Sequence, residues 1–330
     1  MLSAAFLLAS ALAIILVGCH VFTNGVEWLG KRLGVSDGVV GSIFAGVGTA
    51  LPETMIPIMA IYFGTTAAAE EIGLGAIIGA PFMLLTLSLP LGALGIFIFM
   101  RMGRRDNVLN IDTRQVDLEL RVFLLAFSAS MLAVFVPVHA VRVALAGCLL
   151  LLYLYYVKKT VTEGTGLHDE ELPPLILQSG KESPDYLMIG LQVFLSLSAI
   201  VGGAHLFVGA VETLAIGVGI SPLILSLLIT PVATELPEKF NSLIWFYHRK
   251  DQMAVGNITG AMVFQSTFPV VVGLLGTDWQ LEKRVVVSGG MSIFTAAMLL
   301  IVLRLKGGLL PIHILYGVVL YILYAVYVLS

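Results

Sequence analysis

The amino-acid sequence predicts an all-α integral membrane protein with ten transmembrane helices in two inverted-topology repeats of five. Hydrophobic residues make up 58% of the 330 positions and charged residues only 12%, and the mean hydropathy is +0.99. These values lie well outside the range of soluble globular domains. The chain also repeats itself, because residues 18–53 align without a gap on residues 203–238 and are identical at 13 of the 36 positions. Two related membrane-spanning halves are therefore expected.

Ten apolar runs have about the 20 residues that a helix needs to cross a bilayer. They lie near residues 3–27, 38–63, 71–100, 120–138, 140–157, 185–213, 221–246, 253–275, 285–303 and 308–328. The first run continues into the repeat, so we expect a retained span and not a cleaved signal peptide. Substantial polar connections occur at 101–121 and 158–184. The second one divides the chain into a first half at 1–157, a linker at 158–184 and a second half at 185–330.

Basic residues indicate the orientation of the chain. Because each half has an odd number of spans, the second half must enter the membrane from the opposite side. With the N-terminus outside, 14 of the 18 lysine and arginine residues fall on inner loops, and only Lys283 and Arg284 fall on outer loops. The positive-inside rule therefore predicts two extracellular termini and a cytoplasmic linker. The compact loops favour a prokaryotic plasma membrane.

Two glutamates lie where lipid makes charge costly. Glu53 falls near the centre of the second span, and Glu238 falls at the matching depth of the seventh. A carboxylate at mid-membrane costs about 3 kcal/mol even by low estimates, so such residues normally face a water-filled or protein-lined pathway. The alternative is a structural carboxyl group that is hydrogen-bonded or protonated. The symmetric pair favours the pathway.

A proline precedes each glutamate and removes a backbone N–H group from its helix. This frees the carbonyl oxygen four residues earlier, which belongs to Gly48 in the first half and to Ala233 in the second. Unpaired carbonyl groups at membrane depth occur only where they line a cavity or bind something. With the hydroxyl groups of Thr49 and Thr234 and the two carboxylates, they predict an all-oxygen site. Such a site suits a hard cation such as Ca²⁺.

The third and eighth spans carry matching small residues. Gly75 and Gly79 are four positions apart in the third span, as are Gly256 and Gly260 in the eighth. This spacing lets helices approach closely, so we expect the glycines to bring both spans against the helices that carry the carboxylates. Nearby oxygen-bearing side chains are Thr86 in the third span and Gln265, Ser266 and Thr267 in the eighth.

These features resemble the sodium/calcium exchanger family of the cation/calcium antiporter superfamily, in its prokaryotic form, over essentially the full chain. The resemblance rests on GTALPE at 48–53 and ATELPE at 233–238, where the family has GTSLPE. The sequences KRLGVS at 31–36 and GVGIS at 217–221 precede the two motifs and support it. Two such motifs in inverted spans, each followed by a glycine-rich helix, are a specific signature.

The resemblance implies a mechanism as well as a fold. It implies that Glu53 and Glu238 bind Ca²⁺ and the counter-ion in turn, and that Thr49 and Thr234 contribute oxygen atoms. It also implies that the first and sixth helices slide across a rigid core of the other eight. The site would then open alternately to each side of the membrane.

The chain departs from the family pattern at positions that supply oxygen atoms to Na⁺. The family's serine after the threonine is Ala50 in the first repeat and Glu235 in the second. The corresponding positions of the third and eighth spans are Ala80, Leu84, Ala261 and Gln265. These departures make H⁺ the main alternative to Na⁺ as the counter-ion.

Glu235 and Lys239 lie four residues apart on the seventh span, with the glutamate first, which is the favourable order for a helical ion pair. One interpretation is a compensated pair that holds the helix in place. The other is that the Lys239 ammonium group takes the place of a Na⁺ ion, or that Glu235 replaces a lost ligand. The sequence leaves both open.

The predicted function is secondary-active antiport of Ca²⁺, or a related divalent cation, against Na⁺ or H⁺. A passive channel and a transport-impaired regulatory homologue are the rivals. No motif of a membrane-embedded enzyme is present, so we expect no enzymatic activity and no cofactor. Membrane lipid and the transported ions are the expected partners of a functional monomer. A net charge of −3 without long charged runs argues against a nucleic-acid partner.

Overall fold

The computed structural model describes residues 2–33, 51–163, 172–181 and 183–329. All regular structure within these residues is helical, as predicted. Eight helices are long and apolar enough to cross a membrane, and two shorter apolar helices cover residues 51–63 and 222–232. The chain is therefore a multi-pass membrane protein. The count of ten spans stays a prediction, because the part of the predicted second span before residue 51 lies outside the described residues.

The helices follow the order of the two repeats. The first half contains α1 (Leu2–Arg32), α4 (Leu51–Phe63), α5 (Ala67–Met83), the π-helical turn η2 (Leu84–Ser88), α6 (Leu89–Arg101), α7 (Thr113–Leu132), the 3₁₀ turn η3 (Ala133–Phe135) and α8 (His139–Glu163). The second half contains α9 (Tyr186–Val218), α10 (Pro222–Thr234), α11 (Leu236–Tyr247), α12 (Asp251–Gln265), α13 (Phe268–Gly276), α14 (Lys283–Lys306) and α15 (Tyr316–Leu329). Two further 3₁₀ turns are η4 (Ile176–Gln178) and η5 (Pro311–His313).

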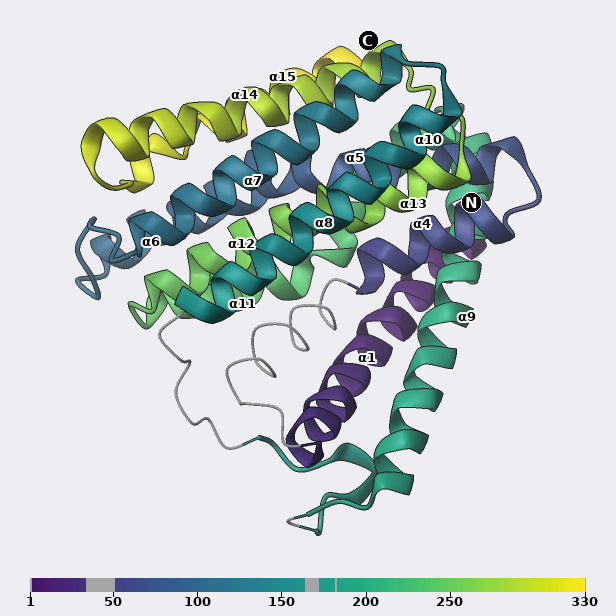
Figure 1. The fold of residues 1–330 in the computed structure, drawn as a ribbon, viewed down its shortest axis with the longest axis horizontal. Helices are drawn as coiled ribbons and strands as arrows, with labels where there is room; N and C mark the ends of the chain where they lie inside the picture. The colour runs from purple at the N-terminus through teal and green to yellow at the C-terminus, as the bar shows by residue number, and fades with distance from the viewer. Residues whose placement is uncertain (1, 34–50, 164–171, 182, 330) are drawn as a thin grey trace.

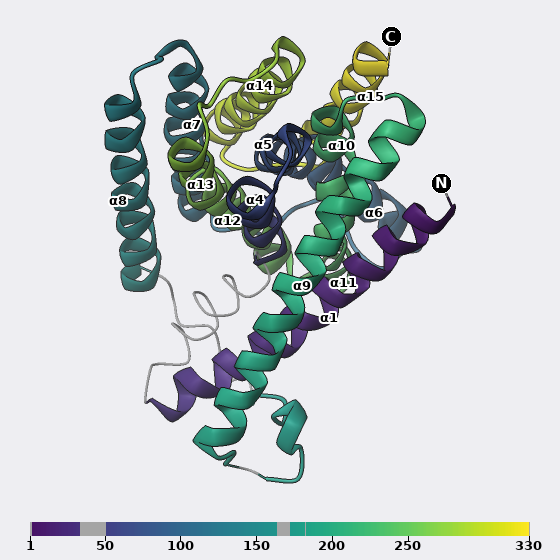
Figure 2. The ribbon, with the colours of Figure 1, turned by 90° about the vertical axis from the view of Figure 1, so that its right-hand side faces the viewer.

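Helices α1 and α9 form a pair at one side of the molecule (Figures 1 and 2). They pack mainly on each other, and the pair reaches the remaining helices through α4, α5 and α10. With 31 and 33 residues, each is about 45–50 Å long at 1.5 Å per residue, which exceeds the ~30 Å hydrocarbon core and favours a tilt. A small residue permits the close crossing, since a methyl group added to Gly203 would lie 2.9 Å from the Ile15 side chain.

Buried amide side chains fasten this pair to the segment that precedes α9. The Gln192 side-chain amide donates a 2.9 Å hydrogen bond to the side-chain oxygen of Asn24 in α1. The backbone N–H groups of Ile176 and Leu177 donate to the side-chain oxygens of Asn24 and Gln192, at 3.1 and 2.9 Å. These bonds join α1, α9 and the end of the predicted linker in one unit.

Helix α5 lies in the middle of the remaining helices, packed against both α4 and α10 (Figure 2). Gly75 and Gly79 form its contact with α10. A methyl group at either position would lie 2.4 Å from a backbone carbonyl oxygen, that of Leu223 or Leu227 respectively. The predicted role of these two glycines is therefore confirmed, because they bring the third span against the helix that carries the second motif.

Two predicted spans are interrupted and not continuous. The seventh, expected at 221–246, divides into α10 and α11 at Glu235. The eighth, expected at 253–275, divides into α12 and α13 after Gln265. Prolines near both breaks, Pro237 among them, remove the backbone N–H groups that would carry the helix through.

Helix α7 begins earlier than the hydropathy suggests. The expected connection at 101–121 ends at Asp112, because its carboxylate accepts hydrogen bonds from the backbone N–H groups of Arg114 and Gln115 and caps the helix. The first two turns of α7 are polar, and they carry Glu119 into the interior.

Candidate cation site

Helix interruptions mark the middle of the fold. At Glu235, between α10 and α11, φ and ψ are −86° and 3°, which lies outside the α-helical region. Helix α5 passes into α6 through the π-helical turn η2, a feature frequent at functional sites. Irregular backbone at membrane depth is tolerated where it is buried in protein or lines a cavity, and discontinuous helices of this kind form the ion and substrate sites of many transporters.

Glu53 lies in the first turn of α4 and has only 4% of its surface exposed. Neither of its carboxylate oxygens has a hydrogen-bond partner among the residues that the structure describes. Thr234, the last residue of α10, and Lys239 in α11 interact with it from the other repeat. The Thr234 hydroxyl donates to the carbonyl oxygen of Thr230 at 3.1 Å, so its lone pairs stay available. Within the described structure, the buried Glu53 carboxylate thus lacks the hydrogen-bond donors that would satisfy its oxygen atoms.

Glu235 lies at the helix break and is completely buried. Its Oε2 accepts a 3.1 Å hydrogen bond from the Ser88 hydroxyl and lies 3.5 Å from the Lys239 ammonium nitrogen. The ion pair that the four-residue spacing predicts is therefore present, although the helix is interrupted at its first member. Glu235 and Glu53 also interact with each other electrostatically. Both glutamates and Lys239 thus belong to one group of charges.

The structure describes some of the remaining predicted site residues fully, some only in their backbone and some not at all. Gln265 is the last residue of α12, is buried, and has no partner for its Oε1 atom in the described part of the chain. Ala233 and Glu238 lie in α10 and α11, but their side chains are outside the described structure. Gly48 and Thr49 lie outside the described residues altogether.

Ser88 contacts the buried group of charges, and the sequence did not reveal this residue. The sequence suggested Thr86 as the oxygen donor of the third span, but the Thr86 hydroxyl donates to the Phe82 carbonyl oxygen of its own helix at 2.5 Å. The π-helical turn adds a residue to the turn and directs Ser88 toward Glu235 instead. The only available signal was a serine close before Pro90 in an apolar run.

A third buried glutamate, Glu119, provides a comparison, because neighbouring side chains satisfy its carboxylate. Glu119 of α7 accepts hydrogen bonds from Gln115 at 2.7 Å, from the Tyr156 hydroxyl at 3.0 Å and from the Thr259 hydroxyl at 2.5 Å. Glu119 is therefore well provided with neutral donors, as buried polar groups normally are. Glu53 has no such hydrogen-bond partners within the described residues, so its environment differs from that of Glu119.

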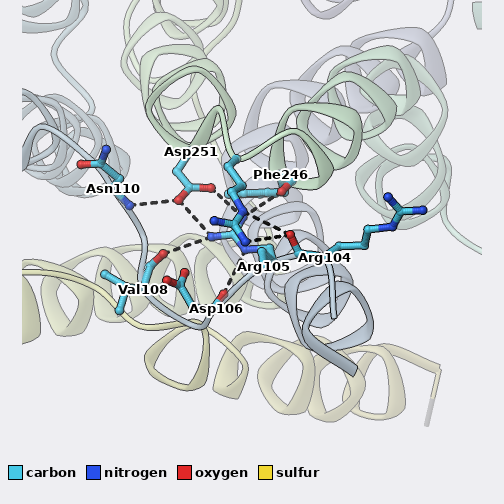
Figure 3. Close-up of polar contacts among 8 residues, drawn as sticks. Arg104, Arg105, Asp106, Val108, Asn110, Phe246 and Asp251 are labelled. Carbon is cyan, nitrogen blue, oxygen red and sulfur yellow. Dashed lines mark hydrogen bonds and ion pairs between the residues drawn. The ribbon is translucent and has the colours of Figure 1, made fainter. Parts of the chain in front are cut away.

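A network outside the predicted spans holds the core helices together at one end (Figure 3). Arg105 forms a bidentate ion pair with Asp251 at 2.6 and 2.9 Å and donates to the carbonyl oxygens of Asp106, Val108 and Phe246. Both side chains are almost fully buried. The Asn110 N–H group donates to the same carboxylate at 2.9 Å. This network fixes the α6–α7 connection against the turn between α11 and α12.

The fold is that of a multi-pass membrane protein, and a buried group of charges lies between interrupted helices of its two repeats. The chain belongs to the sodium/calcium exchanger protein family, a family of transporters, because the family's sequence pattern matches residues 3–158 and 189–330. The family resemblance predicted from the two motifs is therefore confirmed. Within the described residues, no three His, Cys, Asp or Glu side chains cluster as they would around a resident metal.

Related proteins cover most of the chain. An uncharacterized membrane protein of Methanocaldococcus jannaschii is 25% identical over 264 residues, which are 80% of this chain and 79% of that protein. A protein of Alkalimonas amylolytica whose name describes it as an antiporter, CaxA, is 25% identical over 317 residues, which are 93% of this chain and 92% of that protein.

Two solved structures share the fold. The crystal structure of the H⁺/Ca²⁺ exchanger CAX has a TM-score of 0.74 at 14% identity and covers 99% of this chain and 86% of its own. A structure of the sodium-calcium exchanger NCX_Mj, soaked with Na⁺ and Sr²⁺, has a TM-score of 0.60 at 20% identity and covers 98% of this chain and 97% of its own. At these identities the similarity establishes the architecture alone.

Proposed function

We propose that this protein is a secondary-active antiporter that exchanges Ca²⁺, or a related divalent cation, for Na⁺ by alternating access. The observation that carries the proposal is the Glu53 carboxylate, which is buried without a hydrogen-bond partner in the described structure and lies beside Thr234 and Glu235 at a helix break. A buried carboxylate without partners is costly. A bound cation removes that cost, so the arrangement favours ion binding.

Glu53 and Glu238 act together as the principal ligands in this proposal. Thr49 and Thr234 supply hydroxyl or carbonyl oxygens, and the backbone carbonyl groups of Gly48 and Ala233 complete the site next to the prolines. Glu235 and Gln265 add oxygen atoms from the second repeat. Oxygen ligands of this number and charge suit Ca²⁺. Both solved structures with this fold carry names that describe them as calcium exchangers.

Antiport follows from the cost of charge in the membrane. An empty site carries uncompensated carboxylates, and moving it through the barrier is expensive. A bound cation neutralises the site, which lowers the free-energy barrier to moving it through the membrane. The α1–α9 pair is suited to be the moving part, since its helices pack mainly on each other and are fastened together by Asn24 and Gln192. The other helices then form the core across which the pair slides.

A proton is the second candidate for the counter-ion. The positions where Na⁺ would find extra oxygen ligands hold Ala80 and Leu84, which are buried and carry no side-chain oxygen. Protons need no such ligands, because the glutamates themselves accept them. Both termini are proposed to be extracellular in a prokaryotic plasma membrane, with residues 158–184 as the cytoplasmic linker between halves 1–157 and 185–330.

Uptake of ⁴⁵Ca²⁺ into proteoliposomes under separate outward Na⁺ and H⁺ gradients tests the proposal. We expect uptake driven by at least one gradient, and its loss to background in Glu53→Gln. The matched control is Glu70→Gln, which changes an exposed glutamate in the first turn of α5 and should keep wild-type uptake. Gradient-independent leak would indicate a channel. Absence of both flux and Ca²⁺ binding would indicate a regulatory homologue and contradict the proposal.

A further inference from the structure

The ion pair of Glu235 and Lys239 is incomplete in a way that the equally buried pair of Arg105 and Asp251 is not. Glu235 Oε1 and the Lys239 ammonium nitrogen are buried without a hydrogen-bond partner among the described residues. By contrast, Arg105 and Asp251 satisfy each other in a bidentate pair and use surrounding carbonyl and N–H groups as well. If the Glu235–Lys239 pair served only to stabilise the helix, its remaining polar atoms would be expected to find partners too.

The position of Lys239 gives it a different role. Its ammonium group lies 3.5 Å from Glu235 and also acts electrostatically on Glu53, which belongs to the other repeat. Only 7% of its surface is exposed, so little solvent screens this charge. An ammonium group is a compact positive point charge. Lys239 is thus placed among the carboxylates as a small monovalent cation would be.

We infer that Lys239 is a covalently attached monovalent cation of the ion site, which sets how many counter-ions the site exchanges for one divalent ion. This inference rests on the proposed antiport function. The formal charges of Glu53, Glu235 and Lys239 sum to −1, and Glu238, predicted to share the site, brings the sum to −2. One divalent cation or two monovalent cations neutralise that charge, so exchange is electroneutral. Without Lys239 the empty site would require a third monovalent cation.

Charge-changing variants test the inference by counting counter-ions. Release of Ca²⁺ from loaded proteoliposomes is measured against the external concentration of whichever counter-ion drives the wild type. The apparent order should be about two for the wild type and for Lys239→Arg. It should be about three for Lys239→Gln when the counter-ion is also present inside the vesicles, because the Ca²⁺-loaded site of this variant keeps a charge of −1 and crosses the membrane only with one monovalent cation bound beside Ca²⁺. The double variant Glu235→Gln/Lys239→Gln restores the charge of −2 and should return the order to about two.

Two controls keep the result interpretable. Lys306→Gln removes an exposed lysine from the last turn of α14 and should leave the order unchanged. Monodisperse elution in detergent establishes that each variant is folded. The wild type alone supplies a further test, which needs no variant: its equilibrium Ca²⁺ distribution should not respond to a membrane potential imposed with a K⁺ ionophore.

Specific results would overturn the inference. An unchanged order in folded Lys239→Gln, or an order that stays high in the double variant, contradicts it. So does a wild-type Ca²⁺ distribution that shifts by about 50-fold per 100 mV, the response expected for one net charge moved per cycle. In each of these cases gradient-driven exchange persists and the proposed antiport stands. Absence of any counter-ion-driven flux in the wild type refutes the proposed function itself.

Discussion

Replacing Arg105 by methionine is expected to destabilise the core helices strongly. The substitution keeps most of the side-chain volume but removes every hydrogen bond that Arg105 makes. Asp251, of which 3% is exposed, keeps only the Asn110 N–H group as a donor among the described residues, at 2.9 Å. The carbonyl oxygen of Phe246 loses its 2.8 Å bond from Arg105. Removing one partner of a buried ion pair costs about 3–5 kcal/mol, because the other charge is left uncompensated.

Thermal unfolding in detergent, followed by intrinsic fluorescence, measures this cost. At an unfolding entropy of about 2.1 cal/mol/K per residue, a chain of 330 residues loses about 1.4 °C per kcal/mol, so we expect Tm to fall by about 5 °C. The matched control is Arg101→Met, which removes an exposed arginine at the end of α6 and should leave Tm within about 1 °C. The double variant Arg105→Met/Asp251→Leu should be more stable than the sum of its single changes predicts. A Tm of Arg105→Met within about 2 °C of wild type would refute the reasoning.

Two further variants test the contact between α5 and α10 and the role of the buried Glu119 carboxylate. Gly79→Ala places a methyl group 2.4 Å from the Leu227 carbonyl oxygen and should cost about 1–3 kcal/mol in thermal stability, whereas Gly147→Ala, with no described atom within 4 Å of the added methyl group, should cost none. Equal melting temperatures for the two would contradict the close contact of α5 and α10. Glu119→Leu removes the acceptor that Gln115, Tyr156 and Thr259 share, although Thr259 keeps its bond to the Val255 carbonyl oxygen and Gln115 a longer one to Thr160, and should lower Tm by several degrees. Ca²⁺ flux per folded molecule should stay near wild type, and its loss would place Glu119 in the transport pathway.

The features that follow from hydropathy and local spacing could be predicted from the sequence. The burial of Glu53, the close approach at Gly79 and the pairing of Glu235 with Lys239 all depend on apolar context or on a four-residue spacing. Small changes in helix geometry do not alter these properties. They therefore needed no knowledge of the neighbouring helices.

The features that depend on irregular backbone could not be predicted. A proline in a membrane helix is compatible with a smooth bend or with a local interruption, and here the single residue Glu235 leaves helical geometry between α10 and α11. The π-helical turn η2 changes which side chains share a face, so a 3.6-residue period favoured Thr86 over Ser88. The start of α7 could have been found, because Asp112 followed by Gln115 three residues later is a helix-capping pattern. A hydropathy profile alone does not detect this capping pattern.

A crystal soaked in Sr²⁺ and measured for anomalous scattering tests the cation site most directly. Sr²⁺ is an oxygen-binding divalent cation of the same class as Ca²⁺, and it scatters anomalously. The proposed site predicts one strong peak about 2.3–2.6 Å from a Glu53 carboxylate oxygen, allowing for the slightly larger ion. The peak should be absent from crystals of Glu53→Gln. A strong peak that lies elsewhere in the wild type, or one that persists in Glu53→Gln, would contradict the account.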